Sequence, residues 1–173
     1  MDFFIYLFGA LGIGTNILIY QQKTGQKLIG YKLVSDVFWA LHYLFLGAYS
    51  GVAVATVAAL REIVYYNKEK RWASSRIMPF LFMALTVALG IVTWGGYLSL
   101  FTLFASLVAV AGFWKKSPRL SRVLAFPIAT SLLIYDILCG SYLGIVNECV
   151  SMISATVGII RYKNKVSEIK PIK

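Results

Sequence analysis

The sequence predicts an all-α polytopic membrane protein with seven transmembrane helices in a 3+1+3 arrangement, that is, two parallel triple-helix bundles joined by one linking helix. Three observations predict this class: the composition, the number of apolar stretches and the placement of the charges. Of the 173 residues, 59% are hydrophobic and only 14% are charged, which is too apolar for a soluble domain of this length. The lipid bilayer is therefore the first partner that we expect.

The net charge of +10 raises the question of nucleic acid, to which basic proteins often bind. Here the basic residues lie between apolar stretches, and membrane insertion itself places basic loops in such positions. No soluble face is left to carry a basic patch, so we expect no nucleic-acid partner.

Seven apolar stretches are each long enough to cross the ~30 Å hydrocarbon core of a bilayer as a helix. They comprise residues 3–20, 28–46, 49–66, 77–94, 97–114, 120–139 and 142–162. The first stretch is expected to stay in the protein, because Asp2 stands where a cleavable signal carries basic residues. We expect a single membrane domain over residues 1–173, with bundles at 1–67 and 97–162, a linking helix at 77–94 and a cytoplasmic tail at 163–173.

The connectors between these stretches alternate between basic and uncharged, and this alternation orients the chain. Basic residues fill connectors 21–27, 67–76 and 115–119 and the segment after 161, whereas connectors 47–48, 95–96 and 140–141 carry no charge. Basic connectors stay in the cytoplasm, so the N-terminus is expected outside and the C-terminus inside. Lys32 and Arg122 are expected to reach the cytoplasmic surface with their long side chains, which leaves Arg61 as the one cation within the spans.

An internal repeat supports the two-bundle plan. Shifting the sequence by 93 positions aligns residues 19–52 with 112–145 without a gap, and the identities include a Gly-x-Tyr-x-Gly unit that starts at Gly47 and again at Gly140. A linker of one helix makes the two bundles parallel, related by an axis along the membrane normal. The alternative is that similar turns arose independently. The halves are not equivalent, since Pro127 in the sixth stretch corresponds to Val34 in the second.

Polar residues within the spans fall into two layers. Near the outer surface lie His42, Asp136, Asn147 and Glu148, and deeper lie Asn16, Asp36, Arg61 and Glu62. A charge near the centre of a membrane helix costs roughly 2.5–3.5 kcal/mol on insertion scales. We therefore expect these carboxylates to be paired, protonated or in contact with water.

Helical spacing indicates which of these residues form a site. Asp36, Trp39 and His42 share one face of the second stretch, and Asn147 and Glu148 share a face of the seventh with small residues. Packing of helices through small residues explains part of this pattern but not the acids. The predicted solute-binding residues are Asp36, Trp39, His42, Asp136, Asn147 and Glu148.

Two of these assignments have alternatives. Arg61 is expected to form a structural ion pair with Asp36, or else to extend to the cytoplasmic surface. Glu148 is either part of a ligand site or a hydrogen-bonded structural acid, and His42 is the candidate partner for the outer acids because its pKa lies near neutrality.

Catalytic chemistry is not indicated. The sequence has one histidine and two cysteines, Cys139 and Cys149, and no metal-ligand spacing, phosphate-binding loop or nucleophile motif. We expect neither enzyme activity nor a cofactor nor a metal, and we expect free cysteines rather than a disulfide.

Two stretches resemble the YgjV-type family of bacterial inner-membrane proteins. The first, HYLFLGAYSG followed by AALREIV, carries His42, Gly47, Tyr49 and Arg61, and the second, GSYLGIVNE followed by GIIRY, includes Glu148. The resemblance implies a multi-pass protein of the bacterial inner membrane and says little about chemistry.

The 3+1+3 plan is also similar to that of the SWEET sugar transporters and of PnuC-type transporters of vitamin precursors. This likeness implies a solute pathway between two triple-helix bundles, and Asn147 matches a polar Asn that SWEET proteins carry in the seventh helix. The corresponding third-helix position is Val54, most of the expected prolines are missing, and buried acids are unusual for a sugar site.

The sequence therefore predicts a carrier or facilitator of a small polar or cationic solute, with proton coupling as a further hypothesis. The alternative is a membrane protein that does not transport but binds a lipid or a partner subunit. Whether the chain forms a homo-oligomer is left open.

Overall fold

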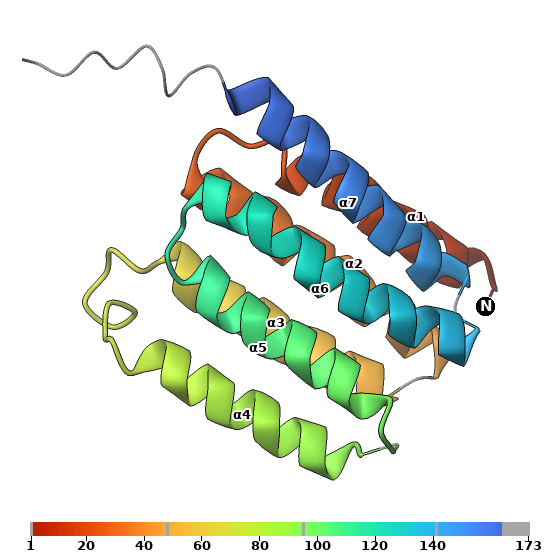
Figure 1. Ribbon diagram of the computed structural model, residues 1–173. Coiled ribbons are helices and arrows are strands. Elements are labelled where there is room, and N and C mark those ends of the chain that lie inside the picture. Colours follow the sequence, from red (N-terminus) through yellow and green to blue (C-terminus); the bar gives the residue numbers. More distant parts are fainter. Residues whose placement is uncertain (1, 48, 95, 141, 164–173) are drawn as a thin grey trace, which may run out of the picture.

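The computed structural model describes residues 2–47, 49–94, 96–140 and 142–163, and these residues form seven helices and no strand (Figure 1). The helices are α1 (Asp2–Ile19), α2 (Gly25–Leu46), α3 (Tyr49–Tyr66), α4 (Met78–Val92), α5 (Ser99–Phe113), α6 (Pro118–Cys139) and α7 (Tyr142–Lys163). The all-helical class and the number of helices are as predicted. The turn residues Ala48, Gly95 and Ser141, and the tail after residue 163, lie outside the described part of the chain.

Two of the described helices are long and apolar enough to cross a membrane, at Pro118–Leu138 and Tyr142–Tyr162. The apolar helices at Phe3–Ile19, Met78–Val92 and Ser99–Phe113 are shorter. The remaining helices, α2 and α3, contain charged residues, which are Lys27, Lys32 and Asp36 in α2 and Arg61 and Glu62 in α3.

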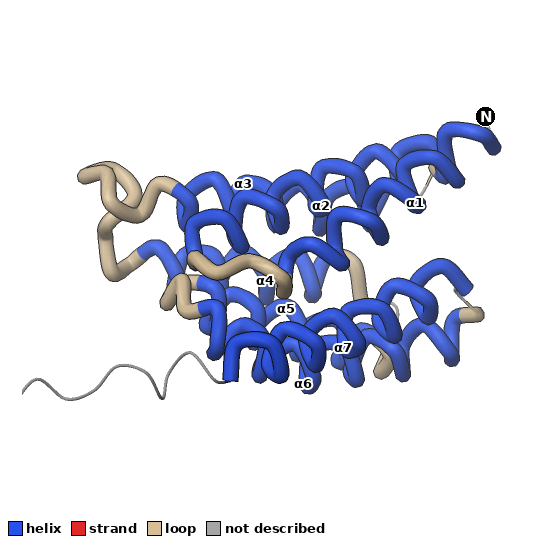
Figure 2. Tube along the Cα trace, turned by 90° about the horizontal axis from the view of Figure 1, so that it is seen from above, coloured by secondary structure: helices blue, strands red, loops and turns tan. Residues whose placement is uncertain are grey.

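The helices form two layers, which both views show. α1, α2 and α3 lie in one layer and α5, α6 and α7 in the other, while α4 lies at the edge against α3 and α5 (Figures 1 and 2). α1 packs on α2 within its layer and on α7 across the layers. The connectors with the basic residues gather at one end of the helices, which we call the basic end, and the opposite end is the charge-free end.

α2 and α6 have matching ends at the offset of 93 residues. Both helices have 22 residues, and each begins after an N-cap whose side chain accepts a backbone hydrogen bond. Thr24 accepts from the N–H of Lys27, and Ser117 accepts from the N–H of Leu120. Each ends at a glycine in the left-handed region, Gly47 with φ 76° and Gly140 with φ 70°, a conformation in which a side chain would be strained. The two helices therefore share the same local structure at both ends.

An apolar core joins the layers near the basic end. Leu28 and Ile29 of α2, Tyr65 of α3, and Val110 and Phe113 of α5 belong to one buried cluster. The hydroxyl group of Tyr65 is buried and donates to the carbonyl of Val110 at 3.0 Å, so that it needs no water. The contact holds α3 and α5 together across the layers.

Arg122 corrects one expectation. Its side chain is buried and does not extend to the surface: Nε donates to the carbonyl of Tyr20 at 2.9 Å and Nη2 to that of Gln22 at 2.7 Å. The last carbonyls of a helix have no partner within the helix, so α6 supplies donors to the end of α1. Gly158 of α7 permits this junction, because a Cβ there would overlap the Tyr20 carbonyl.

Candidate solute-binding site

Asn147 and Glu148 lie in a hydrogen-bonded seam between α7 and α1. Asn16 of α1 donates from Nδ2 to Asn147 Oδ1 at 2.8 Å and to Ser151 Oγ at 2.6 Å. Asn147 in turn donates from Nδ2 to Glu148 Oε1 at 2.8 Å. One carboxylate oxygen of the buried Glu148 is thereby fixed, and the seam joins the two layers.

Trp39 and His42 lie on the face of α2 that packs against α1. The His42 Nδ1–H donates to the Ile5 carbonyl at 2.8 Å, and the ring lies edge-on to Trp39 with 5.2 Å between centroids. Gly9 and Gly12 of α1 make room, since a Cβ at either would lie close to these rings. The hydrogen bond of His42 Nδ1 is therefore to backbone and not to the outer acids that sequence reasoning proposed as partners of this histidine.

Asp136 lies in the last turn of α6, at the charge-free end, where α6 meets α7. Its carboxyl group occupies the space where a Cβ at Gly144 would be, so the glycine of the second Gly-x-Tyr-x-Gly unit allows the two helices to meet there. Tyr43 of α2 lies within electrostatic range of both Asp136 and Glu148. These groups therefore face one another across the layers.

The expected Arg61–Asp36 ion pair is not the one that forms. Asp36 Oδ1 accepts from Lys32 Nζ at 2.9 Å, and Glu62 Oε1 accepts from Arg61 Nε at 3.1 Å and Nη2 at 2.8 Å. Lys32 lies one helical turn before Asp36 on the same face, so it reaches the acid instead of the surface. Lys32 and the buried Arg122 are thus further cations within the spans, which corrects the assignment of Arg61 as the only one.

Two carboxylate oxygens in this region are buried without a hydrogen-bond partner. Asp36 is 8% exposed and Glu62 is 0% exposed. Asp36 Oδ2 and Glu62 Oε2, together with Ser121 Oγ, are the buried side-chain atoms of the described residues that lack a partner. An unsatisfied buried acceptor of this kind costs roughly 1–3 kcal/mol, and more when it is charged.

Five charged side chains form what we call the central cluster: Lys32, Asp36, Arg61, Glu62 and Glu148. The cluster connects the layers, because Glu148 of α7 interacts electrostatically with Lys32, and Glu62 interacts with Lys32 and Asp36. Tyr20, directly after α1, lies within electrostatic range of all three acids. With two cations and three carboxylates, the ionised cluster has one negative charge in excess.

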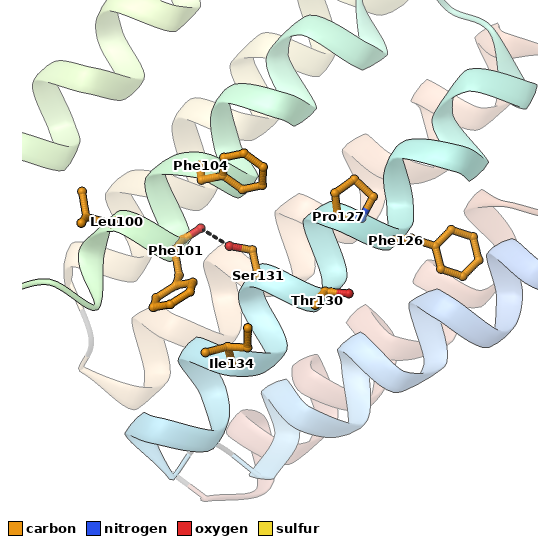
Figure 3. Close-up of a pocket in the computed structure, with 8 residues that line it drawn as sticks. All are labelled: Leu100, Phe101, Phe104, Phe126, Pro127, Thr130, Ser131 and Ile134. Carbon is orange, nitrogen blue, oxygen red and sulfur yellow. Dashed lines mark hydrogen bonds between the residues drawn. The ribbon is translucent and has the colours of Figure 1, made fainter.

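The larger of two cavities lies elsewhere. A groove of about 530 Å³ runs between α5 and α6 beside Pro127, and aromatic residues such as Phe101 and Phe104 line it (Figure 3). Its polar side chains include Ser131, which donates to the Phe101 carbonyl at 2.9 Å. None of the six predicted solute-binding residues lines this groove.

The smaller cavity, of about 80 Å³, lies between α3, α4 and α5, and Arg61 of the central cluster lines it. Sequence reasoning found Asp36, Asn147 and Glu148 but did not assign Lys32, Glu62 or Asn16 to a site. The spacing of four between Lys32 and Asp36 was a signal for their pair. No sequence signal pointed to the contact of Asn16 with α7, because it joins residues 131 positions apart.

Comparison with protein-family models matches residues 3–166 to Imp-YgjV, a family described as bacterial inner membrane protein. No curated protein and no solved structure matches the chain. The match covers all seven helices except one residue at the start of α1.

Proposed function

The chain belongs to the Imp-YgjV family of bacterial inner membrane proteins, and we propose that it carries a small polar or cationic solute across that membrane. One observation carries the proposal: the central cluster holds two buried carboxylate oxygens without partners, Asp36 Oδ2 and Glu62 Oε2. Acids inside a membrane protein are costly and mark solute or ion pathways.

The charges of the cluster favour a cation. Lys32 and Arg61 each neutralise one acid by direct contact, at 2.9 and 2.8 Å, whereas Glu148 accepts from the neutral amide of Asn147. A monovalent cation would offset the remaining charge and donate hydrogen bonds to the unpartnered oxygens. We therefore assign binding to Asp36, Glu62 and Glu148, with Asn147 positioning Glu148.

The two-layer arrangement supports a carrier that works by alternating access. The cluster draws its acids from α2, α3 and α7 and therefore lies where the layers meet. Carriers built from two related bundles place their sites between the bundles and rock one against the other. The matching ends of α2 and α6 support a repeat of this kind.

The test is a thermal-shift measurement on the purified protein with guanidinium as the cation and urea as its neutral counterpart, at equal ionic strength. We expect guanidinium to raise the unfolding midpoint and urea not to do so. Asp36→Asn and Glu148→Gln should each reduce the shift. Glu69→Gln is the control, since Glu69 is 83% exposed and lies outside the cluster.

Uptake of labelled guanidinium into proteoliposomes then separates binding from transport. A carrier is supported if wild-type protein accelerates guanidinium exchange and the Asp36→Asn variant does not. Equal shifts with urea and guanidinium, or equal responses of all variants, would contradict the proposal.

The second candidate function is lipid binding without transport, and the groove between α5 and α6 favours it. Its volume of about 530 Å³ and its apolar lining suit an acyl chain. Thr130→Trp should fill the groove and remove lipid that copurifies with the protein. If this variant keeps guanidinium exchange, the groove is not part of the solute path.

A further inference from the structure

The 80 Å³ cavity is a cleft that reaches from the charge-free end toward the middle of the bundle. Thr93 at the end of α4 and Thr102 in the first turn of α5 line its outer part, Thr86 and Ser106 line it farther in, and Arg61 lies at its floor. Arg61 follows the start of α3 by twelve residues, which is ~18 Å at 1.5 Å per residue. The cleft therefore approaches the central cluster from the side opposite to α7.

The lining offers hydroxyl groups to water among apolar side chains such as Val57 and Leu103. The Thr86 hydroxyl donates to the Phe82 carbonyl at 2.7 Å and the Thr102 hydroxyl to the Ser99 carbonyl at 2.9 Å. Each hydroxyl oxygen still has lone pairs that accept from water. At ~10–15 Å³ for each water centre, the cleft has room for about five to eight waters.

Arg61 lines the floor of the cleft, and Glu62, which does not line it, follows Arg61 on α3. Arg61 donates to Glu62 Oε1, and Glu62 Oε2 is buried without a partner. Among the described residues, the groups that face Glu62 are Arg61 and Tyr65 of its own helix, Lys32 and Asp36 of α2, and Tyr20, directly after α1.

We propose that the cleft is a water path for protons to Glu62, and that the central cluster holds either one proton or one monovalent cation, so that the protein exchanges protons for cations. In the proton step a hydronium ion moves from the cleft past Arg61, transfers its proton to Glu62 Oε2 and becomes water, and the reverse step returns the proton. The exchange of protons for cations rests on the proposed transport of a cation, whereas the water path to Glu62 does not.

The charge balance gives the reason for exchange. The ionised cluster has one negative charge in excess, and a single proton or a single monovalent cation makes it neutral. Binding both would leave an uncompensated positive charge inside the membrane, which is costly. Entry of the cation therefore drives release of the proton.

The path is tested without any solute, in a background with Cys139→Ala and Cys149→Ala. Ser106→Cys lines the cleft, whereas Ala105→Cys lies at the same depth on α5 but is buried outside the cleft. Ag⁺ applied from the charge-free side should react with Ser106→Cys at least tenfold faster than with Ala105→Cys. Equal rates, or no reaction at Ser106→Cys, would overturn the path.

The exchange is tested in proteoliposomes with labelled guanidinium, which stays charged at all working pH values. An acidic interior should drive accumulation by wild-type protein. Glu62→Gln fixes the cluster in its neutral form and should lose guanidinium exchange. Arg61→Gln/Glu62→Gln restores the excess negative charge and should regain exchange, now without dependence on the pH gradient.

The outcomes separate the two proposals. If wild-type protein exchanges guanidinium regardless of the pH gradient, or if the double variant keeps the gradient dependence, proton exchange at Glu62 is overturned while the carrier stands. If wild-type protein does not exchange guanidinium at all, the carrier proposal fails for this class of cation, and the Ag⁺ rates still decide the path.

Discussion

Lys32 determines the electrostatics of the central cluster, because its ammonium group pairs with the buried Asp36 at 2.9 Å. We predict that Lys32→Met destabilises the protein by about 3–5 kcal/mol, since it leaves a buried carboxylate unpaired. Thermal unfolding in detergent measures the effect. Lys32→Met/Asp36→Leu should recover most of the loss, and Lys115→Met, in an exposed position, should have little effect. A double variant no more stable than the single one would contradict this account.

The pairing of Lys32 shows why the site was only partly predictable. Counting residues predicts Asp36, Arg61 and Glu62 in an inner layer and Glu148 in an outer one, whereas the central cluster contains all four. Counting gives only the depth along a helix. It does not determine which way a long side chain turns. Lys32 can extend toward the surface or toward Asp36, and the choice depends on α5, where Phe113 lies 5.5 Å from its Nζ.

At the scale of the elements, the contact of α7 with α1 and α6 depends on close approach at Gly158. A Cβ there would overlap the Tyr20 carbonyl and lie against Arg122. We predict that Gly158→Ala lowers the unfolding midpoint, at a cost of about 1–3 kcal/mol. Gly14→Ala is the control, because a Cβ at Gly14 has nothing within 4 Å and alanine favours a helix by about 1 kcal/mol. Equal effects of the two would show that the junction tolerates a methyl group.

The caps of α2 and α6 provide a second test at this scale. Thr24→Ala and Ser117→Ala each remove a side-chain acceptor from a helix start. Each substitution should lower the free energy of unfolding by about 1 kcal/mol. We expect similar losses because the two caps have the same local structure. Unfolding midpoints of the single and double variants measure this, and additive effects are expected because the caps share no partner.

The helix ends were predictable where the chain carries a turn signal and less so elsewhere. Residue 46 was the expected end of the second helix and is the end of α2, because Gly47 takes a left-handed conformation. Its start was expected at residue 28 from the apolar stretch, but α2 begins at Gly25 after the cap at Thr24. Apolar stretches indicate which residues meet lipid, whereas hydrogen-bonding caps determine where a helix begins.

At the scale of the whole molecule, three buried acids have alanine at the corresponding position in the other half of the chain. At the offset of 93 residues, Asp36 and Glu62 correspond to Ala129 and Ala155, and both alanines are buried. In the other direction, Glu148 corresponds to the buried Ala55. Large charged side chains thus have small counterparts in the other half, which provides space for them between the layers.

The orientation in the membrane is a prediction about the whole molecule. In the background without cysteines, Thr93→Cys at the charge-free end should react with an impermeant maleimide in intact cells. Ser74→Cys, exposed at the basic end, should react only after the inner membrane is opened. The reverse pattern would invert the orientation and place the mouth of the cleft in the cytoplasm.

The capping of α1 by Arg122 has a consequence for biogenesis. The two carbonyls that receive the guanidinium group are 102 and 100 residues earlier in the chain, so the ribosome has made most of the protein before the donors exist. The end of α1 therefore acquires these contacts only after α6 has been made. A nascent chain that stops before α6 leaves the two carbonyls without the donors of Arg122.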